Sequence, residues 1–207
     1  MTEKQNDIVR EAFPAYRRKE EVLYTVEDYM ALPDDRRCEL IDGVLYDMAA
    51  PRKVHQALLF ELLVQMKACI EKSNRKCIVY PGPIDVQLDC DEYTMVQPDL
   101  AVLCREDDPD VHAVQGAPDF VVEIISPSNR SHDTVRKFNK YKNAHVRELW
   151  LIDPELQEIQ VHCFEKDRSK TYPLDAVVEV EISEGKCKID FSGIMDDLKQ
   201  FFGRDLI

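Results

Sequence analysis

Three stretches decide the fold of this chain: QPDLAVL (residues 97–103), DFVVEIISPS (119–128) and DTVRKFNKY (133–141). The first two contain apolar runs of the length and composition of buried strands. The third has helical spacing, with Asp133, Lys137 and Tyr141 at positions i, i+4 and i+8 of one face. The pattern therefore predicts two neighbouring strands that each carry an acid, followed directly by a helix that carries lysines.

The two acids are Asp99 and Glu123. Pro98 has no N–H to donate to a sheet, so it favours a strand start and places Asp99 at the mouth of the strand at 100–103. Glu123 interrupts an apolar run, where a glutamate is rarely buried without a partner or a metal. The alternatives are that Asp99 caps a turn and that Glu123 forms a salt bridge with a nearby lysine.

The side chain of Lys137 is expected to point along its helix towards the end of the strand that contains Glu123. We expect the segment 126–128 to end that strand, and Ser131 or Asp133 to cap the helix. Two acids and a lysine are the groups that a metal-dependent phosphodiesterase needs, because carboxylates bind Mg²⁺ or Mn²⁺ and a lysine can orient water. The alternative for Asp133 and Lys137 is an ordinary i,i+4 ion pair, worth only about 0.3–0.5 kcal/mol.

The rest of the pattern predicts a polar tail at 1–21 and a single α/β domain at 22–207, with one central mixed sheet flanked by helices. Asp42-Gly43 is a strong hairpin signal, and the apolar residues between Leu58 and Ile70 have helical spacing. Outside the three stretches we expect helices at 25–31, 54–72 and 194–202, a hairpin of 38–41 with 44–48, and strands at 77–80, 84–88, 148–153, 159–164, 177–182 and 186–189.

The composition is that of a soluble globular protein, with 44% hydrophobic and 32% charged residues among 207. No apolar run approaches the ~20 residues that span a bilayer, and the first residues lack the apolar core of a signal peptide. A cytoplasmic location without a membrane partner is therefore expected. The seven cysteines contain no CxxC pair, which argues against a zinc ribbon and favours reduced, buried thiols.

Charge is unevenly distributed along the chain. The net charge of −13 argues against a general nucleic-acid coat protein. However, residues 85–110 contain nine acids and one base, whereas residues 126–147 contain six bases and one acid. A cationic surface beside an acidic site can hold a polyanion at one place only; the alternative is an ordinary solvated helix face. The expected nucleic-acid contacts are Arg130, Arg136, Lys140 and Lys142.

Several motifs occur in a fixed order: YTVEDY at 24–29, ELIDG at 39–43, His55, QPDL at 97–100, VEIISPS at 122–128, the Asp133/Lys137/Tyr141 triplet and ELWLIDP at 148–154. Together they resemble the Uma-two family of restriction endonucleases, within the PD-(D/E)xK nuclease superfamily. The resemblance covers residues 24–164. It implies a restriction endonuclease-like core.

The resemblance also implies a metal site in which Asp99 and Glu123 are ligands, helped by the backbone carbonyl of Ile124. The lysine of the superfamily normally lies two residues after the glutamate. That position is Ile125 here, and the matching family helix carries its lysine at Lys137.

Glu39 matches the acid of the family's ELIDG motif and is a candidate to support the metal or a second water. Its alternative is a hairpin acid paired at the surface. His55 is a candidate ligand, a substrate contact or simply a residue at a helix start. Asp133 and Tyr141 are further candidates for a supporting role.

The expected function is Mg²⁺- or Mn²⁺-dependent hydrolysis of DNA phosphodiester bonds, in which Asp99 and Glu123 bind the metal and Lys137 positions or deprotonates water, or neutralises the transition state. The alternative is a catalytically inactive nuclease-fold protein with a binding or assembly role, which the acidic balance and the displaced lysine favour. A cysteine nucleophile has no Cys-His spacing to support it. Residues 177–202 are the candidate interface of a homodimer.

Overall fold

The computed structural model describes residues 23–33, 35–73, 76–88, 92–106, 108–127 and 130–203. The expected tail at 1–21, Cys90 and Ser128 lie outside these residues.

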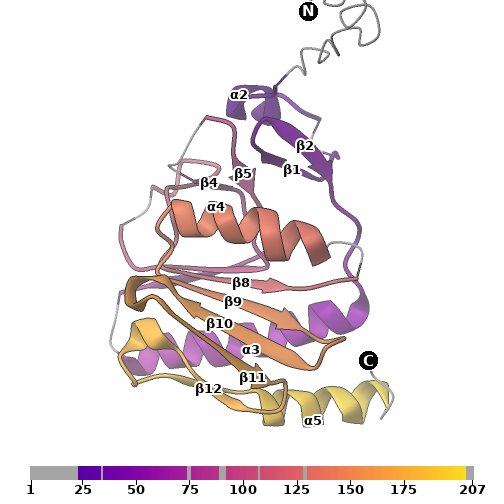
Figure 1. Cartoon of the computed structure of the whole chain (residues 1–207), viewed down its shortest axis with the longest axis vertical. Coiled ribbons are helices and arrows are strands. Elements are labelled where there is room, and N and C mark those ends of the chain that lie inside the picture. Colours follow the sequence, from indigo (N-terminus) through magenta and orange to yellow (C-terminus); the bar gives the residue numbers. More distant parts are fainter. Residues whose placement is uncertain are drawn as a thin grey trace, which may run out of the picture.

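A six-stranded sheet in the order β11-β10-β9-β8-β6-β3 forms the centre of the fold (Figure 1). β8 and β9 are parallel and all other neighbours are antiparallel, so the sheet is mixed. The predicted α/β class with a central mixed sheet flanked by helices is confirmed. The strands are β3 (Ile78–Pro81), β6 (Leu100–Leu103), β8 (Phe120–Ile124), β9 (Glu148–Asp153), β10 (Glu158–Cys163) and β11 (Arg168–Pro173).

A second sheet, which the sequence did not predict, runs in the order β2-β1-β5-β4-β7. Three of its strands have only two residues, too few for an alternating pattern to be recognised. The predicted hairpin turn is present, with positive φ at both Asp42 and Gly43. The strands are β1 (Cys38–Ile41), β2 (Val44–Asp47), β4 (Val86–Gln87), β5 (Met95–Val96) and β7 (Val114–Gln115).

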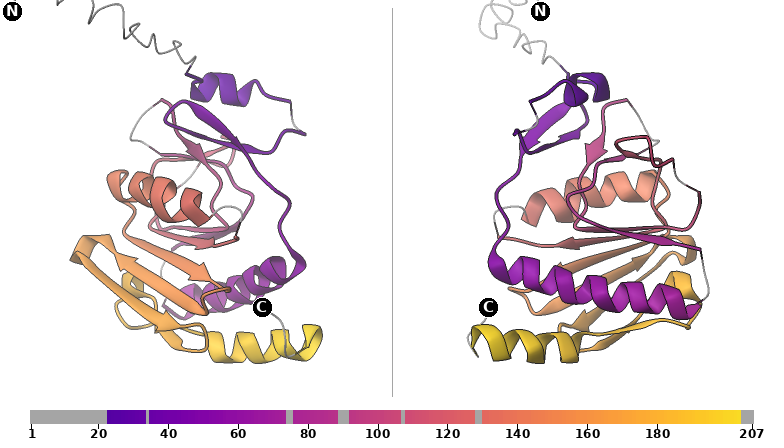
Figure 2. Two further views of the ribbon diagram at one scale, coloured as in Figure 1. Left: turned by 45° about the vertical axis from the view of Figure 1, so that its right-hand side comes forward. Right: turned by 180° about the vertical axis from the view of Figure 1, so that it is seen from behind.

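Helices cover both faces of the central sheet. α3 (Lys53–Ser73) and α5 (Phe191–Phe202) lie on one face, and α4 (Phe138–Asn143) lies on the other, between the two sheets (Figure 2). α5 begins three residues before the predicted start at 194, because the Asp190 side chain caps it by accepting from the Gly193 N–H. None of the described helices is long and apolar enough to cross a membrane.

The remaining elements are short. α2 (Val26–Met30) begins at the predicted Thr25 capping box. A two-stranded sheet pairs β12 (Val177–Glu179) with β13 (Lys188–Asp190). Single turns of 3₁₀-helix follow β10 and β12, at Phe164–Lys166 (η2) and Glu181–Ser183 (η3). β11 was not predicted because it is a polar, largely exposed edge strand without apolar alternation.

β8 is buried on both faces, so its side chains alternate between two apolar clusters. Val122 and Ile124 pack in the cluster under α3 and α5, together with Trp150. Val121 packs in the cluster beneath the second sheet, which includes Tyr141 of α4. Glu123 follows the parity of Val121, and its carboxylate therefore points towards α4.

Four cysteines form disulfide bonds, so the expectation of reduced thiols is wrong for these four residues. Cys69 is disulfide-bonded to Cys187, and Cys77 to Cys104. Cys77 and Cys104 continue the antiparallel register of β3 and β6, in which Ile78 lies opposite Leu103, so the sheet itself brings them together. Two more of the described cysteines, Cys38 and Cys163, are buried and free.

Replacing Leu62 by alanine should lower the free energy of unfolding by about 2–5 kcal/mol, because this fully buried side chain of α3 would leave a cavity. Phe60→Ala is the matched control on the same helix. Its side chain is 60% exposed, so its loss should cost within about 0.5 kcal/mol. Urea unfolding of both variants measures the difference. Equal losses would contradict the packing of α3 described above.

Candidate active site

A pocket of about 580 Å³ opens where the carboxyl end of β8, the start of α3 and the helical turn before α4 meet. Its walls bring together most of the residues that the sequence predicts for the site: Glu39, His55, Asp99, Glu123, Ile124, Asp133 and Lys137. Tyr141 lies behind the wall, fully buried against Glu123. The predicted site residues therefore converge, although they come from five segments of the chain.

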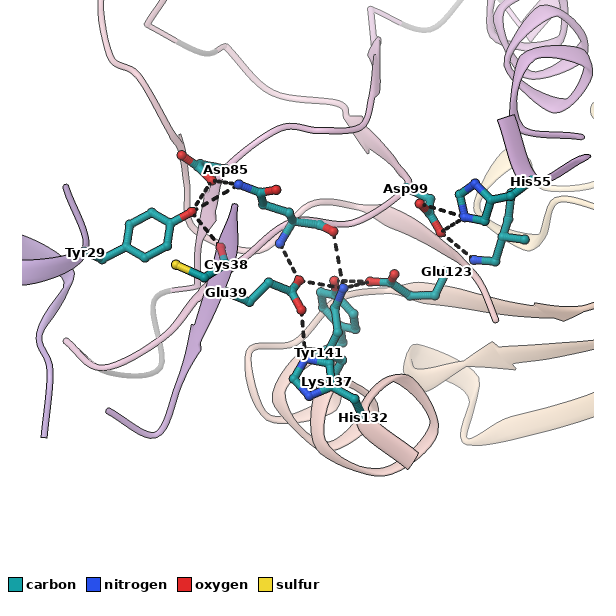
Figure 3. A network of polar contacts seen from close by, with 12 residues as sticks. Tyr29, Cys38, Glu39, His55, Asp85, Asp99, Glu123, His132, Lys137 and Tyr141 are labelled. Carbon is teal, nitrogen blue, oxygen red and sulfur yellow. Dashed lines mark hydrogen bonds and ion pairs between the residues drawn. The ribbon is translucent and has the colours of Figure 1, made fainter. Parts of the chain in front are cut away.

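Lys137 is the centre of the site (Figure 3). Its ammonium group lies 2.7 Å from Glu39 Oε1 and 2.6 Å from Glu123 Oε1, and it donates to the Gln97 carbonyl at 3.3 Å. The side chain is 2% exposed, so these partners replace its water. The alternative of an ordinary Asp133–Lys137 ion pair is wrong, because no such pair forms among the described residues.

A π-helical turn, η1 (His132–Lys137), precedes α4 and delivers Lys137 to the site. In a regular α-helix each residue turns about 100°, so residues five apart face directions about 140° apart. The wider i→i+5 turn brings such residues to one side. The predicted helix at 131–144 is therefore not a plain α-helix. Ser131 and Asp133 both lie within the helix, and the Ser131 side chain makes no capping hydrogen bond, so the predicted cap at either residue is wrong.

His132 shares the side of the helix on which Lys137 lies. His132 Nε2 is 2.8 Å from Glu39 Oε2, while Lys137 contacts Oε1 of the same carboxylate. His132 was not among the residues predicted for the site. The spacing of residues could not indicate it, because a regular α-helix would place His132 on a different side from Lys137. Its partner, Glu39, also lies 93 residues earlier in the chain.

Glu39 is buried, so the alternative of a surface hairpin acid is wrong. Besides His132 and Lys137, it accepts a hydrogen bond from the Gln97 N–H at 2.7 Å. Burial opposes ionisation, but the charge of Lys137 and the hydrogen bonds outweigh it and lower the pKa of Glu39 to about 2. Glu39 is therefore a permanently ionised partner that keeps the ammonium group of Lys137 in place.

Glu123 has a different environment. Tyr141 donates to Glu123 Oε1 at 2.6 Å, and Lys137 contacts the same oxygen. Oε2 has no hydrogen-bond partner among the described residues. Burial raises the pKa of Glu123, and the neighbouring charges of Asp133, Asp99 and Glu39 raise it further against the opposing effect of Lys137. The single positive charge of Lys137 is therefore too small to neutralise Glu123 together with the neighbouring carboxylates of Asp133, Asp99 and Glu39.

Asp99 lies beside Glu123 on the same face of the sheet. β6 and β8 are antiparallel with Leu100 opposite Val122, so Asp99 continues the register opposite Glu123. Asp99 Oδ2 accepts from the Ile124 N–H at 2.7 Å, and His55 Nε2 lies 3.2 Å from both carboxylate oxygens. These contacts orient the Asp99 carboxylate, and His55 approaches it from the first turn of α3.

Behind the pocket, a second set of contacts holds Gln97, whose backbone contacts both Glu39 and Lys137. Its side-chain amide donates to Asp85 Oδ1 at 2.8 Å and to the Tyr29 hydroxyl at 3.1 Å. Tyr29 in turn donates to Asp85 at 2.8 Å. Neither Tyr29 nor Asp85 was predicted for the site, since their link to Gln97 exists only once the second sheet has formed.

The four basic residues predicted to contact nucleic acid lie outside the described pocket wall. Arg130 pairs with Asp153 and, at 2.7 Å, with Glu155. Lys140 Nζ lies 2.5 Å from Asp42 Oδ1, Arg136 lies over the Tyr46 ring, and Lys142 is exposed. Their role as nucleic-acid contacts stays a prediction.

The pocket offers carboxylate and carbonyl oxygens, which are the ligands that a divalent cation such as Mg²⁺ prefers. No group of three or more His, Cys, Asp or Glu side chains is poised for a metal in the described part of the chain. Mg²⁺, however, commonly takes only one or two protein carboxylates and keeps several waters. Asp99 and Glu123 are adjacent, Glu123 Oε2 lacks a described protein partner, and Ile124 lines the same wall. These residues fit such a cation.

Replacing Asp133 by asparagine should stabilise the metal-free protein, and more so at high pH. Asp133 is 7% exposed, and burial raises its pKa from 3.8 to about 6. The folded state therefore binds the proton more tightly than the unfolded chain, and stability falls as the pH rises through this window. The advantage of Asp133→Asn should grow by about 2 kcal/mol between about pH 4.5 and 7.5. Urea unfolding in EDTA measures it, and a pH-independent difference would contradict the assignment.

Known proteins share this architecture. A crystal structure described as "a putative nuclease belonging to DUF820" from Anabaena variabilis superposes with a TM-score of 0.69 at 18% identity, covering 83% of this chain and 97% of that chain. A search of curated proteins finds no match. The model of the Uma2 family, described as "Putative restriction endonuclease", matches residues 26–186. Since this match spans most of the chain, the protein belongs to the Uma2 family.

Proposed function

We propose that this protein is a nuclease that hydrolyses DNA phosphodiester bonds with the help of Mg²⁺ or Mn²⁺. The observation that carries the proposal is the meeting of Asp99, Glu123 and Lys137 in one pocket, with the two carboxylates side by side and the lysine on one of them. The description of the Uma2 family and that of the Anabaena variabilis structure support the same class of reaction.

In this proposal Asp99, Glu123 and the carbonyl of Ile124 hold the cation. When bound, it supplies a Lewis acid for the phosphate and lowers the pKa of a water. His55 and the Ile124 N–H keep the Asp99 carboxylate oriented. The buried hydroxyl of Tyr141 fixes Glu123 Oε1 and leaves Oε2 for the pocket.

Lys137 acts as a cation rather than as a base. Burial alone would lower its pKa, but the charges of Glu123 and Glu39 raise it well above its ordinary value. An ammonium group has three donors, and Glu39, Glu123 and Gln97 receive them. Lys137 therefore positions Glu123 and contributes positive charge beside the phosphate that is attacked.

The proposal predicts that Mn²⁺-dependent cleavage of supercoiled plasmid falls at least about 100-fold in Asp99→Asn and Glu123→Gln, since each loses a ligand charge. Glu71→Gln, exposed at the far end of α3, is the matched control and should cleave as the wild type does. EDTA should abolish cleavage in all active proteins. Circular dichroism checks that each variant is folded. Equal cleavage by every variant would indicate a contaminating nuclease and end the assignment.

A second candidate, an inactive nuclease fold with a binding or assembly role, is favoured by the engagement of all three lysine donors within the protein. Calorimetric titration with Mn²⁺ separates the two. A nuclease should bind the ion in the wild type and lose that binding in Asp99→Asn. Binding that is absent, or that is unchanged in the variant, would favour the inactive fold.

A further inference from the structure

We propose that Arg37 and Arg52 form a phosphate-binding rim on this pocket and hold the DNA backbone on either side of the carboxylate pair. The inference rests on the proposed function and deepens it, since it names the groups through which the acidic pocket accepts a polyanion. It differs from the sequence-based prediction, which places those contacts on the helix at 130–142.

The pocket needs such a rim because its own charge opposes DNA. Five acids line it: Glu39, Asp99, Glu123, Asp133 and Glu155. The buried cation Lys137 is already bound by two of them, and His55 is bound by a third. A phosphate that approaches therefore requires positive charge beyond these groups, and a divalent ion accounts for only part of it.

Arg37 supplies positive charge on the side of Glu39. The Met48 N–H donates to the Arg37 carbonyl at 2.9 Å, which extends the β1–β2 ladder by one pair beyond Cys38 and Asp47. Residues two apart on an extended strand point to the same face. Arg37 thus lies on the Glu39 face of the strand, where it lines the pocket and remains exposed to solvent.

Arg52 supplies positive charge on the side of His55. It directly precedes α3, and its carbonyl accepts from the Gln56 N–H at 3.1 Å, so its backbone joins the first turn of the helix. Arg52 also lines the pocket and is exposed. Figure 3 shows Glu39 and His55 on opposite sides of Glu123. The two arginines therefore belong to different walls of the pocket.

Neither guanidinium has a hydrogen-bond or ion-pair partner in the described part of the chain. This is unusual here, because the chain has 40 acidic and 27 basic residues. Four of the other described arginines form ion pairs: Arg36 with Asp47, Arg130 with Asp153 and Glu155, Arg147 with Asp119 and Glu165, and Arg168 with Glu181. Arg105 donates to the backbone carbonyls of Ala117 and Gln115, and Arg136 lies over the Tyr46 ring. A guanidinium left unpaired at the mouth of an acidic pocket has its whole planar donor fork available for phosphate oxygens.

The test is the salt dependence of DNA binding in EDTA, where no cleavage occurs. A fluorescein-labelled duplex of about 20 base pairs and its single strand are titrated with full-length protein by fluorescence anisotropy, from about 50 to 300 mM NaCl. The variants are Arg37→Ala, Arg52→Ala and the double variant. The matched controls are the chain neighbours Arg36→Ala and Lys53→Ala, which remove the same charge outside the pocket wall.

Each rim variant should weaken binding several-fold and reduce the slope of log K against log salt by about 0.9 on duplex or about 0.7 on single strands, with about twice that loss in the double variant. The controls should keep the wild-type slope. A loss that occurs on only one of the two probes then identifies the strandedness of the bound DNA.

Rim variants that keep the wild-type slope, while Arg136→Ala or Lys142→Ala lose it, would overturn the proposal in favour of the helix. If the wild type also cleaves plasmid, the proposed function survives that outcome. Conversely, a reduced slope in the rim variants supports the rim even where no cleavage is found. A wild-type protein that binds neither probe at the lowest salt overturns the rim, whereas the absence of plasmid cleavage with Mn²⁺ separately overturns the proposed function.

Discussion

The buried ammonium group of Lys137 is the interaction on which the rest of the structure depends. It joins Glu39 of the second sheet, Glu123 of the central sheet and the Gln97 carbonyl between them. Burying one charge is costly unless opposite charges and hydrogen bonds replace its water. The two sheets, the Gln97 loop and the π-helical turn must therefore all be in place before all of these groups are compensated. Removing one partner would leave a buried charge without compensation, which typically costs about 3–5 kcal/mol.

This arrangement is not the one that would stabilise the fold most. A pair of well-packed apolar residues would hold two sheets together with less desolvation. Instead, five acids line a single pocket with one buried lysine, and the pKa values of Glu39 and Asp133 are moved in opposite directions by their surroundings, to about 2 and about 6. Such opposed shifts within one cleft are typical of functional sites. The excess of carboxylates gives the pocket a negative charge that favours cations nearby, both a divalent ion and the two arginines that line it.

The π-helical turn explains how a lysine reaches the glutamate from a helix instead of from the strand. Two residues after Glu123 the chain carries Ile125, which packs in the apolar cluster beneath the second sheet. The wider turn at His132–Lys137 lets the helix present both a histidine and a lysine to Glu39. The lysine is therefore held by a second carboxylate, Glu39, in addition to Glu123.

Much of the site and of the central sheet could be predicted from the sequence, and the reason is local. Pro98 before an apolar run places Asp99 at a strand start, and a glutamate inside an apolar strand requires a partner. Helical spacing was enough to put Lys137 and Tyr141 on one face. The strands of two residues, the pairing of four cysteines and the polar edge strand β11 carry no comparable local signal. Contacts between residues far apart in the chain were equally hidden, such as the contact between Glu39 and His132, which are 93 residues apart.

The sequence by itself determined which residues are acidic, basic or apolar and how they repeat. This is enough to predict the helices and strands and the candidate ligands. Only the tertiary structure decided which charges meet and which arginines stay unpaired, because pairing depends on distance in space and on loss of water, and neither is encoded in spacing along the chain.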